Sequence, residues 1–176
     1  MLVVGLAVVY VTAFIAVLSS PWVPSRKKDY KKIISAINPK KGEIVYDLGS
    51  GDGRLCMEIA RRTKSTVVGV ELSFIYYGIS RLRVLLSGLG NRVKIRWGNF
   101  YRQSISDADK VFLYLTSRTA TQLAHKLSRE LKEGALVITY QYPIQGWNHM
   151  KKIQNNKNSS PIYLYRLDKK TQKPVI

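Results

Sequence analysis

The segment between residues 47 and 53 carries the strongest chemical signal in the sequence. Its residues are Asp-Leu-Gly-Ser-Gly-Asp-Gly, so an acid precedes three glycines at alternate positions. Glycine lets the backbone turn sharply and approach a ligand closely, and free N–H groups point outward where the next helix begins. The dinucleotide fingerprint G-x-G-x-x-G does not fit, because Arg54 stands where its third glycine would be.

A second acid, Glu71, follows 18 residues after Gly53, at the end of the next apolar stretch. In other open sheets that bind nucleosides, an acid at this point accepts hydrogen bonds from both hydroxyls of a ribose. A glycine triplet alone is a weak signal. A strand, an Asp-led loop, a helix and this Glu together predict a nucleoside-containing ligand.

Alternating strands and helices must position these residues. From Gly42 onward the sequence predicts strands at residues 44–48, 66–71, 92–97, 110–115 and 135–142 and helices at 54–64, 73–89 and 119–131, after a basic helix at 27–37. This alternation indicates an open parallel sheet with helices on both faces. Residues 149–154 and 162–168 predict two strands with no room for a helix between them, so an antiparallel hairpin closes one edge. The expected fold class is therefore α/β, with a mostly parallel, seven-stranded sheet.

The N-terminal segment differs from the rest of the chain. No charged residue occurs before Arg26, and residues 1–18 are apolar except for Thr12. About 20 such residues cross a hydrocarbon core of about 30 Å, so we expect a transmembrane anchor at residues 1–20. The alternatives are a buried core helix or a cleaved signal peptide, although a signal peptide normally has positive charge before its apolar stretch.

The basic flank of this segment predicts the orientation of the chain. Its cations are Arg26, Lys27, Lys28, Lys31 and Lys32. By the positive-inside rule, the N-terminus lies outside and the catalytic domain on the cytoplasmic side of a single-pass membrane protein, or at the mitochondrial inner membrane in a eukaryote. The expected organisation is an anchor at 1–20, a basic juxtamembrane segment and helix at 21–41, and one domain at 42–176.

Composition limits the partners. Of the 176 residues, 29 are Lys or Arg and 11 are Asp or Glu, which gives a net charge of +18 and favours nucleic acid, an acidic membrane surface or an acidic protein. Because the densest basic run directly follows the predicted anchor, we favour an anionic lipid surface over nucleic acid. One cysteine and two distant histidines argue against a disulfide framework and a metal site.

From Gly42 to Asp168 the chain resembles class I S-adenosylmethionine-dependent methyltransferases, with a Rossmann-like sheet. The resemblance implies S-adenosyl-L-methionine as cofactor, with Asp47, Gly49 and Gly51 at its methionine portion and Glu71 at its ribose. The residues after the third strand would border the adenine. Among them, Asn99 stands where many members of the family carry Asp. The other cofactor-binding residues expected on this basis are Tyr46, Ser50, Leu72, Asn99 and Phe100.

A narrower resemblance covers most of the chain. Pro-Trp-Val-Pro-Ser, Tyr-Asp-Leu-Gly-Ser-Gly-Asp-Gly-Arg, Gly-Val-Glu-Leu, Gly-Asn-Phe and Thr-Tyr-Gln-Tyr-Pro occur in this order. This series is similar to the small membrane-anchored protein-lysine methyltransferases related to the enzymes that modify the ATP synthase c subunit and the adenine nucleotide translocase, together with their prokaryotic relatives. The resemblance implies methylation of an accessible lysine on a membrane or membrane-associated protein.

Candidates for the substrate side follow the fourth and fifth strands. A lysine acceptor must lose its proton, which desolvation near a sulfonium favours, so the chemistry requires no dedicated base. We expect a polar and aromatic wall around the amine, formed by Tyr114, Thr116, Gln141, Tyr142 and Trp147. The alternatives are a methyltransferase acting on RNA, other nucleic acid or a small molecule, and a non-catalytic, membrane-tethered S-adenosylmethionine-binding protein. Methyltransferases that act on base amino groups commonly carry Asn/Asp-Pro-Pro-aromatic after the fourth strand, where this chain has Leu-Tyr-Leu-Thr-Ser-Arg.

Overall fold

The structure, a computed structural model, describes Gly5 and residues 25–168. Apart from Gly5, the predicted anchor at residues 1–20 lies outside the described residues. Within the part of the chain that the structure describes, no helix combines the length and the apolar character needed to cross a membrane.

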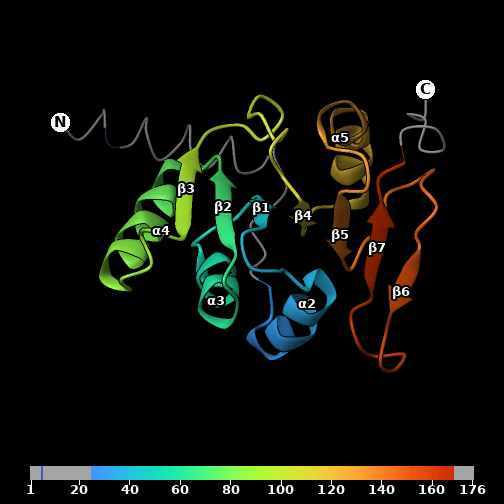
Figure 1. Cartoon of the computed structure of the whole chain (residues 1–176), viewed down its shortest axis with the longest axis horizontal. Helices are drawn as coiled ribbons and strands as arrows, with labels where there is room; N and C mark the ends of the chain where they lie inside the picture. The colour runs from blue at the N-terminus through green and yellow to red at the C-terminus, as the bar shows by residue number, and fades with distance from the viewer. Residues whose placement is uncertain (1–4, 6–24, 169–176) are drawn as a thin grey trace.

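A seven-stranded sheet forms the centre of the domain (Figure 1). Its strands are β1 (Ile44–Leu48), β2 (Thr66–Glu71), β3 (Val93–Trp97), β4 (Lys110–Leu113), β5 (Leu136–Tyr140), β6 (Lys151–Ile153) and β7 (Ile162–Arg166), in the order β3-β2-β1-β4-β5-β7-β6. The first five are parallel, and β7 runs antiparallel to both β5 and β6. The predicted mostly parallel sheet with a terminal antiparallel hairpin is confirmed.

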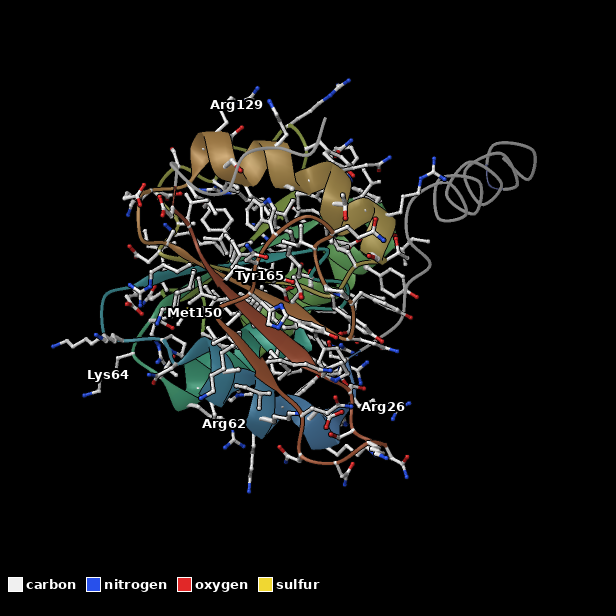
Figure 2. All side chains as sticks on the ribbon, turned by 90° about the vertical axis from the view of Figure 1, so that its right-hand side faces the viewer. Arg26, Arg62, Lys64, Arg129, Met150 and Tyr165 are labelled. Atoms are coloured by element: carbon white, nitrogen blue, oxygen red, sulfur yellow. The ribbon has the colours of Figure 1, made fainter. Side chains whose placement is uncertain are left out.

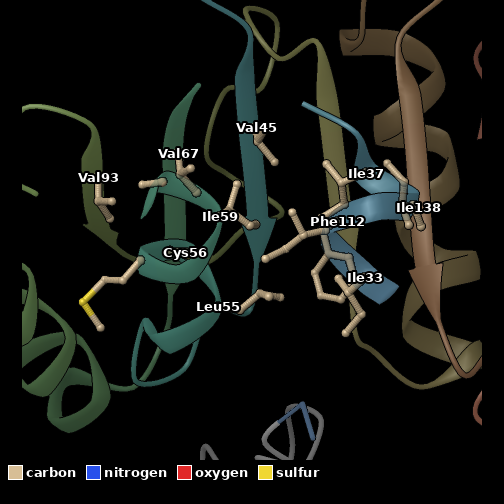
Figure 3. Close-up of a cluster of buried hydrophobic side chains, with 14 of the residues drawn as sticks. Ile33, Ile37, Val45, Leu55, Cys56, Ile59, Val67, Val93, Phe112 and Ile138 are labelled. Carbon is tan, nitrogen blue, oxygen red and sulfur yellow. The ribbon is translucent and has the colours of Figure 1, made fainter. Parts of the chain in front are cut away.

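Helices cover both faces of this sheet. They are η1 (Lys27–Asp29), α2 (Tyr30–Ile37), α3 (Arg54–Arg62), α4 (Phe74–Leu86) and α5 (Ser117–Glu130). One buried cluster joins α2, α3 and α4 to the sheet and includes Ile33, Ile59 and Phe112 (Figure 3). A second cluster packs α5 against the other face. Figure 2 shows these layers, with α5 on one side of the sheet and α2 on the other.

The positive charge surrounds this core. Figure 2 shows Arg62, Lys64 and Arg129 projecting outward, whereas Tyr165 lies in the interior. The long basic side chains are therefore distributed over several elements, which include α3 and α5 as well as the segment before α2.

The fourth strand is shorter than the sequence predicts. Leu48 pairs with Leu113, and the chain then turns away from the sheet at Gly49, whose φ is 91°. Tyr114 and Leu115 consequently have no partner on β1, and they leave the sheet at its carboxyl edge. This departure places the end of β4 beside the glycine loop, where the sequence predicts the chemistry.

Replacing Gly69 tests how tightly this loop packs on β2. A Cβ at Gly69 would lie 2.7 Å from Ser50 Oγ and 2.9 Å from Ile95 Cδ1, so we expect Gly69→Ala to lower the free energy of unfolding by about 1–3 kcal/mol. The matched control is Gly78→Ala on α4, where a Cβ meets nothing within 4 Å and higher helix propensity adds about 1 kcal/mol. Urea unfolding of the full chain measures both. Equal effects of the two substitutions would contradict the close packing.

Candidate active site

The glycine loop connects β1 to α3 at the carboxyl edge of the sheet. Gly49, Gly51 and Gly53 have φ values of 91°, 55° and 75°, a region that side-chain-bearing residues rarely adopt. The N–H groups of Gly49 and Ser50 donate to the carbonyl oxygen of Val70 at 2.9 and 3.0 Å. The loop is therefore fixed against the end of β2, and among its residues 49–53 only Gly49 is exposed.

Glu71 connects the loop to the beginning of α4. Its Oε2 accepts the N–H of Gly51 at 2.8 Å, and its Oε1 accepts the N–H of Ser73 at 2.7 Å. The residue is only 8% exposed, and burial raises the pKa of its carboxyl against the opposing effect of these backbone bonds. Each carboxylate oxygen retains a further lone pair, so an oriented carboxylate can still accept a diol.

Asp47 is the second buried acid. The Cys56 thiol donates to its Oδ2 at 3.3 Å. Burial raises the pKa of Asp47 to about 7; the Cys56 hydrogen bond opposes this rise, and the charge of Glu71 adds to it. Two neighbouring acids whose ionised forms are disfavoured by burial make a site that gains from a cationic ligand.

Asp52, in the same loop, has the opposite environment. Its Oδ2 contacts Arg54 Nε at 2.7 Å and Arg83 Nη1 at 2.5 Å. Burial alone would raise the pKa of Asp52, but hydrogen bonds and charge from the two arginines outweigh it and the pKa is lowered. Arg83 also donates to the Asp52 carbonyl oxygen at 3.2 Å, so α4 holds the loop from the side.

The segment after β3 lies next to Glu71. Gly98 donates its N–H to the Glu71 carbonyl oxygen at 2.9 Å. The side-chain oxygen of Asn99 accepts the N–H of Tyr101 at 2.9 Å, and Phe100 packs partly against the cluster that contains α5. Asn99 and Phe100 are thus brought to the same edge as the ribose-site candidate.

The other three expected cofactor residues have different surroundings. The side chain of Tyr46 lies on the opposite face from Asp47, because neighbouring strand residues alternate. It is fully buried, donates to Asp107 Oδ1 at 2.8 Å and accepts from Arg96 at 2.9 Å. Ser50 Oγ is buried against Gly69 and has no hydrogen-bond partner among the described residues. Leu72 accepts a hydrogen bond from Trp97 Nε1 through its carbonyl oxygen at 3.0 Å.

On the substrate side, the structure brings Tyr114 and Gln141 together. The Tyr114 hydroxyl donates to Gln141 Oε1 at 2.9 Å, and the Tyr114 ring meets that of Tyr140 edge to face at 4.8 Å. Gln141 has a φ of 75°, and among the described non-glycine residues only Asn38 shares this positive φ. Such strain is frequent at functional sites, where the surrounding structure maintains it.

The remaining wall candidates divide into two groups. Tyr142 follows Gln141 and is 40% exposed, whereas Thr116 is exposed and caps α5 by accepting the N–H of Thr119 at 3.3 Å. Trp147 is buried and packs edge to face on Tyr165, within the cluster on the other face of the sheet. The large ring of Trp147 therefore contributes to the core on this face, whereas Tyr114 packs against the cluster on the opposite face.

Sequence reasoning missed the segment before α2. The Tyr140 hydroxyl donates to Asp29 Oδ2 at 2.7 Å, which links two residues 111 positions apart. Tyr30 is partly buried, and burial raises its pKa, with Arg54 opposing and Asp52 and Asp47 adding to the rise. The sequence feature that could have pointed to this contact is the position of Asp29, which is the first acid of the chain and stands within a run of lysines.

A cavity of about 580 Å³ lies at the amino-terminal ends of the strands, away from the glycine loop. Two of the cations at its wall have acidic partners: Lys110 pairs with Glu43 at 2.8 Å and Lys132 with Asp109 at 3.1 Å. The buried acids Asp47 and Glu71 are at the opposite, carboxyl edge, which is where open α/β sheets bind ligands.

Comparisons with known proteins identify the family of the chain. Residues 47–151 match the ANTKMT methyltransferase domain family. The chain is 31% identical to a protein-lysine N-methyltransferase of Saccharolobus islandicus, over 82% of this chain and 92% of that protein. It is 29% identical to the human lysine N-methyltransferase for the c subunit of ATP synthase, over 81% of this chain but only 60% of the human protein.

A solved structure of another protein has a similar fold. An RNA methyltransferase from Salinibacter ruber, in complex with S-adenosyl-L-homocysteine, superposes with a TM-score of 0.78 at 25% identity. The similarity covers 82% of this chain and 94% of that protein.

The two acids of the glycine loop predict opposite effects on stability. Because the pKa of Asp47 is about 7 in the folded protein and 3.8 ordinarily, the folded state holds a proton that the unfolded state has lost between these values. Stability therefore falls as pH rises from about 4 to about 7 and stays lower above that range. We expect Asp47→Asn to increase the free energy of unfolding at about pH 8 and to have a smaller effect at about pH 5.

The matched control is Asp52→Asn. Its carboxyl has a lowered pKa, so the ionised form stabilises the fold above the ordinary pKa, and the amide should be destabilising at neutral pH. Urea unfolding of the full chain without ligand, at both pH values, measures the two variants. Destabilisation by Asp47→Asn at about pH 8 would contradict the assignment of a strained, buried carboxyl.

Proposed function

The chain belongs to the ANTKMT methyltransferase family and is an S-adenosylmethionine-dependent methyltransferase, and on this premise we propose that it methylates a lysine side chain of a protein. The similarity to a protein-lysine N-methyltransferase over most of both chains is the observation that carries the proposal. Because this chain spans only part of the human relative, the identity of the protein substrate is not transferred with it.

The proposed cofactor contacts follow from the geometry of the loop. Asp47, Gly49 and Gly51 would hold the methionine portion, Glu71 the ribose, and the segment with Asn99 and Phe100 the adenine. The positive φ angles of the glycines and the orientation of Glu71 by two backbone N–H groups support this arrangement. Ser50 and Leu72 would contribute backbone next to these contacts, and Tyr46 would support the position of Asp47.

When bound, S-adenosylmethionine supplies an activated methyl group on a cationic sulfonium. Asp47 and Glu71 favour binding of a cation because their own charges lack a compensating cation of the kind that Asp52 has. These residues thus contribute binding and orientation, which is most of what methyl transfer requires from a protein.

The proposed acceptor wall consists of Tyr114, Gln141, Tyr142 and Thr116, with Tyr140 behind them. Because the Tyr114 hydroxyl donates its proton to Gln141, its oxygen has lone pairs available to accept an N–H of the incoming amine. An amine held through its N–H groups presents its own lone pair to the methyl group. Aromatic rings around it exclude water and favour the neutral amine.

We also propose that the enzyme acts at a membrane. The uncharged residues 1–20 would form the anchor, and the basic segment that follows would keep the catalytic domain on the cytoplasmic side. A lysine on a membrane or membrane-associated protein would then lie within reach of the site.

Methylation of RNA is the second candidate function. Two observations favour it, namely the similarity to the Salinibacter ruber RNA methyltransferase and the net charge of +18. The absence of the Asn/Asp-Pro-Pro-aromatic motif after β4 argues against a base amino group as the acceptor.

Cofactor affinity should depend on pH through Asp47. The cationic cofactor favours the carboxylate, whereas the free site holds a proton below about pH 7. We expect the affinity for the cofactor to fall about tenfold from about pH 8 to about pH 6. At the lower pH the carboxyl of Asp47 is protonated in the free site, and this proton must be released when the cofactor binds. Isothermal titration calorimetry in two buffers of different ionisation enthalpy measures the affinity and the protons released.

Asp47→Asn is the control for this measurement, since it should bind weakly and without the pH dependence. A pH-independent affinity in the unmodified protein would contradict the role of Asp47. Complete absence of cofactor binding at both pH values would contradict the assignment of the site.

The acceptor is tested with methyl-labelled S-adenosylmethionine and separate membrane-protein, soluble-protein and RNA fractions. We expect protease-sensitive label in a protein, mapped to lysine by mass spectrometry, and none with Glu71→Ala. Tyr114→Phe should lower kcat about tenfold, the value of one hydrogen bond in the transition state, whereas Tyr163→Phe on β7 should leave it unchanged. Label that enters RNA and survives protease would replace the lysine proposal with the RNA one.

A further inference from the structure

Helix α4 presents an apolar surface to solvent. We define the α4 face as six side chains of this helix together with Trp97 on the neighbouring edge strand β3. Its members and their exposed fractions are Phe74 62%, Ile75 53%, Ile79 37%, Leu82 57%, Leu85 76%, Leu86 78% and Trp97 56%. These are seven of the ten large apolar side chains that are exposed in the described part of the chain, so the exposure is concentrated in one place.

Packing of the domain does not account for this face. At about 100° per residue, the six helical side chains cover a stripe about 140° wide, and its centre points away from the buried residues Ser80 and Val84. Arg81 and Arg83 lie at the two edges of the stripe. The outward side of α4 is therefore apolar and flanked by arginines, which suits contact with the boundary of a bilayer.

Trp97 extends the face beyond the helix. Its ring meets Phe74 edge to face at 5.6 Å, and its Nε1 donates to the Leu72 carbonyl oxygen at 3.0 Å. Its N–H is therefore satisfied within the protein while half of the residue stays exposed. An amphipathic ring in this position is suited to the headgroup level of a membrane.

The charge around the α4 face indicates which kind of partner it contacts. From Leu72 to Ser106 the sequence contains no Asp or Glu, and its six cations are Arg81, Arg83, Arg92, Lys94, Arg96 and Arg102. A second copy of the same face would bring like charges together, because no acid of this segment can oppose them. Arg83, Arg92 and Arg96 already bind groups within the domain, whereas Arg81 and Lys94 are exposed. An anionic lipid surface satisfies the apolar stripe and these exposed cations at the same time.

We infer that the α4 face docks the domain on an anionic lipid bilayer. The contact is separate from the predicted anchor, since it uses residues 74–97 alone. It also positions the site, because α4 begins two residues after Glu71 at the N-cap Ser73, and Arg83 of the same helix holds Asp52. Docking through α4 brings the glycine loop and the carboxyl edge of the sheet close to the lipid–water boundary.

Spin labels on the full chain in vesicles test this contact. One label is placed by Leu86→Cys on the α4 face and the other by Lys157→Cys in the exposed loop between β6 and β7; the native Cys56 is buried. In vesicles of phosphatidylcholine with phosphatidylserine, we expect the residue-86 label to be accessible to oxygen and shielded from a water-soluble nickel complex. In vesicles of phosphatidylcholine alone, the residue-86 label should become accessible to the nickel complex. The residue-157 label should be accessible to the nickel complex in both kinds of vesicle.

The other outcomes overturn the inference. Nickel access at residue 86 in both vesicles would show that the face is free in water. Shielding from both relaxants with spin–spin broadening would identify a second copy of the chain, and shielding from both without broadening would identify another protein segment as the occupant. None of these readouts involves methyl transfer, so the result is independent of the acceptor proposed above.

A charge variant separates apolar docking from the effect of the basic residues alone. With the spin label at Leu85→Cys, Leu82→Glu combined with Leu86→Glu should abolish lipid contact, and unchanged urea unfolding would show that the exposed positions leave the fold intact. The matched control is Met150→Glu, which replaces another exposed apolar side chain at the opposite edge of the sheet and should keep the contact. Persistent lipid contact in the double variant would contradict docking through the α4 face.

Discussion

The carboxylate of Glu71 connects three segments that meet only at the carboxyl end of β2. One oxygen holds the N–H of Gly51 in the glycine loop, and the other holds the N–H of Ser73 at the beginning of α4. The backbone of the same residue accepts a hydrogen bond from Gly98 after β3. A buried carboxylate is unfavourable without such partners, so the positions of the loop, the helix and the segment after β3 depend on one another.

One buried acid of the candidate site, Asp47, lowers the stability of the fold when it is ionised. Arginines compensate Asp52, and the result is a structural acid with a lowered pKa. Asp47 has only a thiol and a neighbouring carboxylate, and its pKa rises to about 7. Two acids five residues apart thus have opposite pKa shifts because only one of them contacts cations. The ionised form of Asp47 therefore gains from a cation placed beside it.

Local patterns were sufficient to predict much of this arrangement. The glycine spacing and the apolar strands before and after it are short-range features, and they located the loop, Glu71 and the succession of strands along the chain. The contact between Asp29 and Tyr140 could not be predicted in this way, because it joins residues 111 positions apart. The positive φ of Gln141 has no signal in the sequence either, since side-chain-bearing residues rarely adopt it. For Trp147, residue type alone suggested the wall, but burial against Tyr165 decided its place.

Helix α4 shows why an apolar pattern is an ambiguous predictor. Its sequence predicted a helix correctly, but apolar residues occur on almost every side of it, which is typical of a helix buried in a core. The structure places it at one end of the sheet, over the edge strand β3, where a single side suffices to cover the sheet (Figure 1). The inner side of α4 includes the arginine that holds the loop, and the outer side bears the apolar stripe. One helix therefore serves both the geometry of the site and the surface that the domain presents, and a constraint on either side limits the sequence of the other.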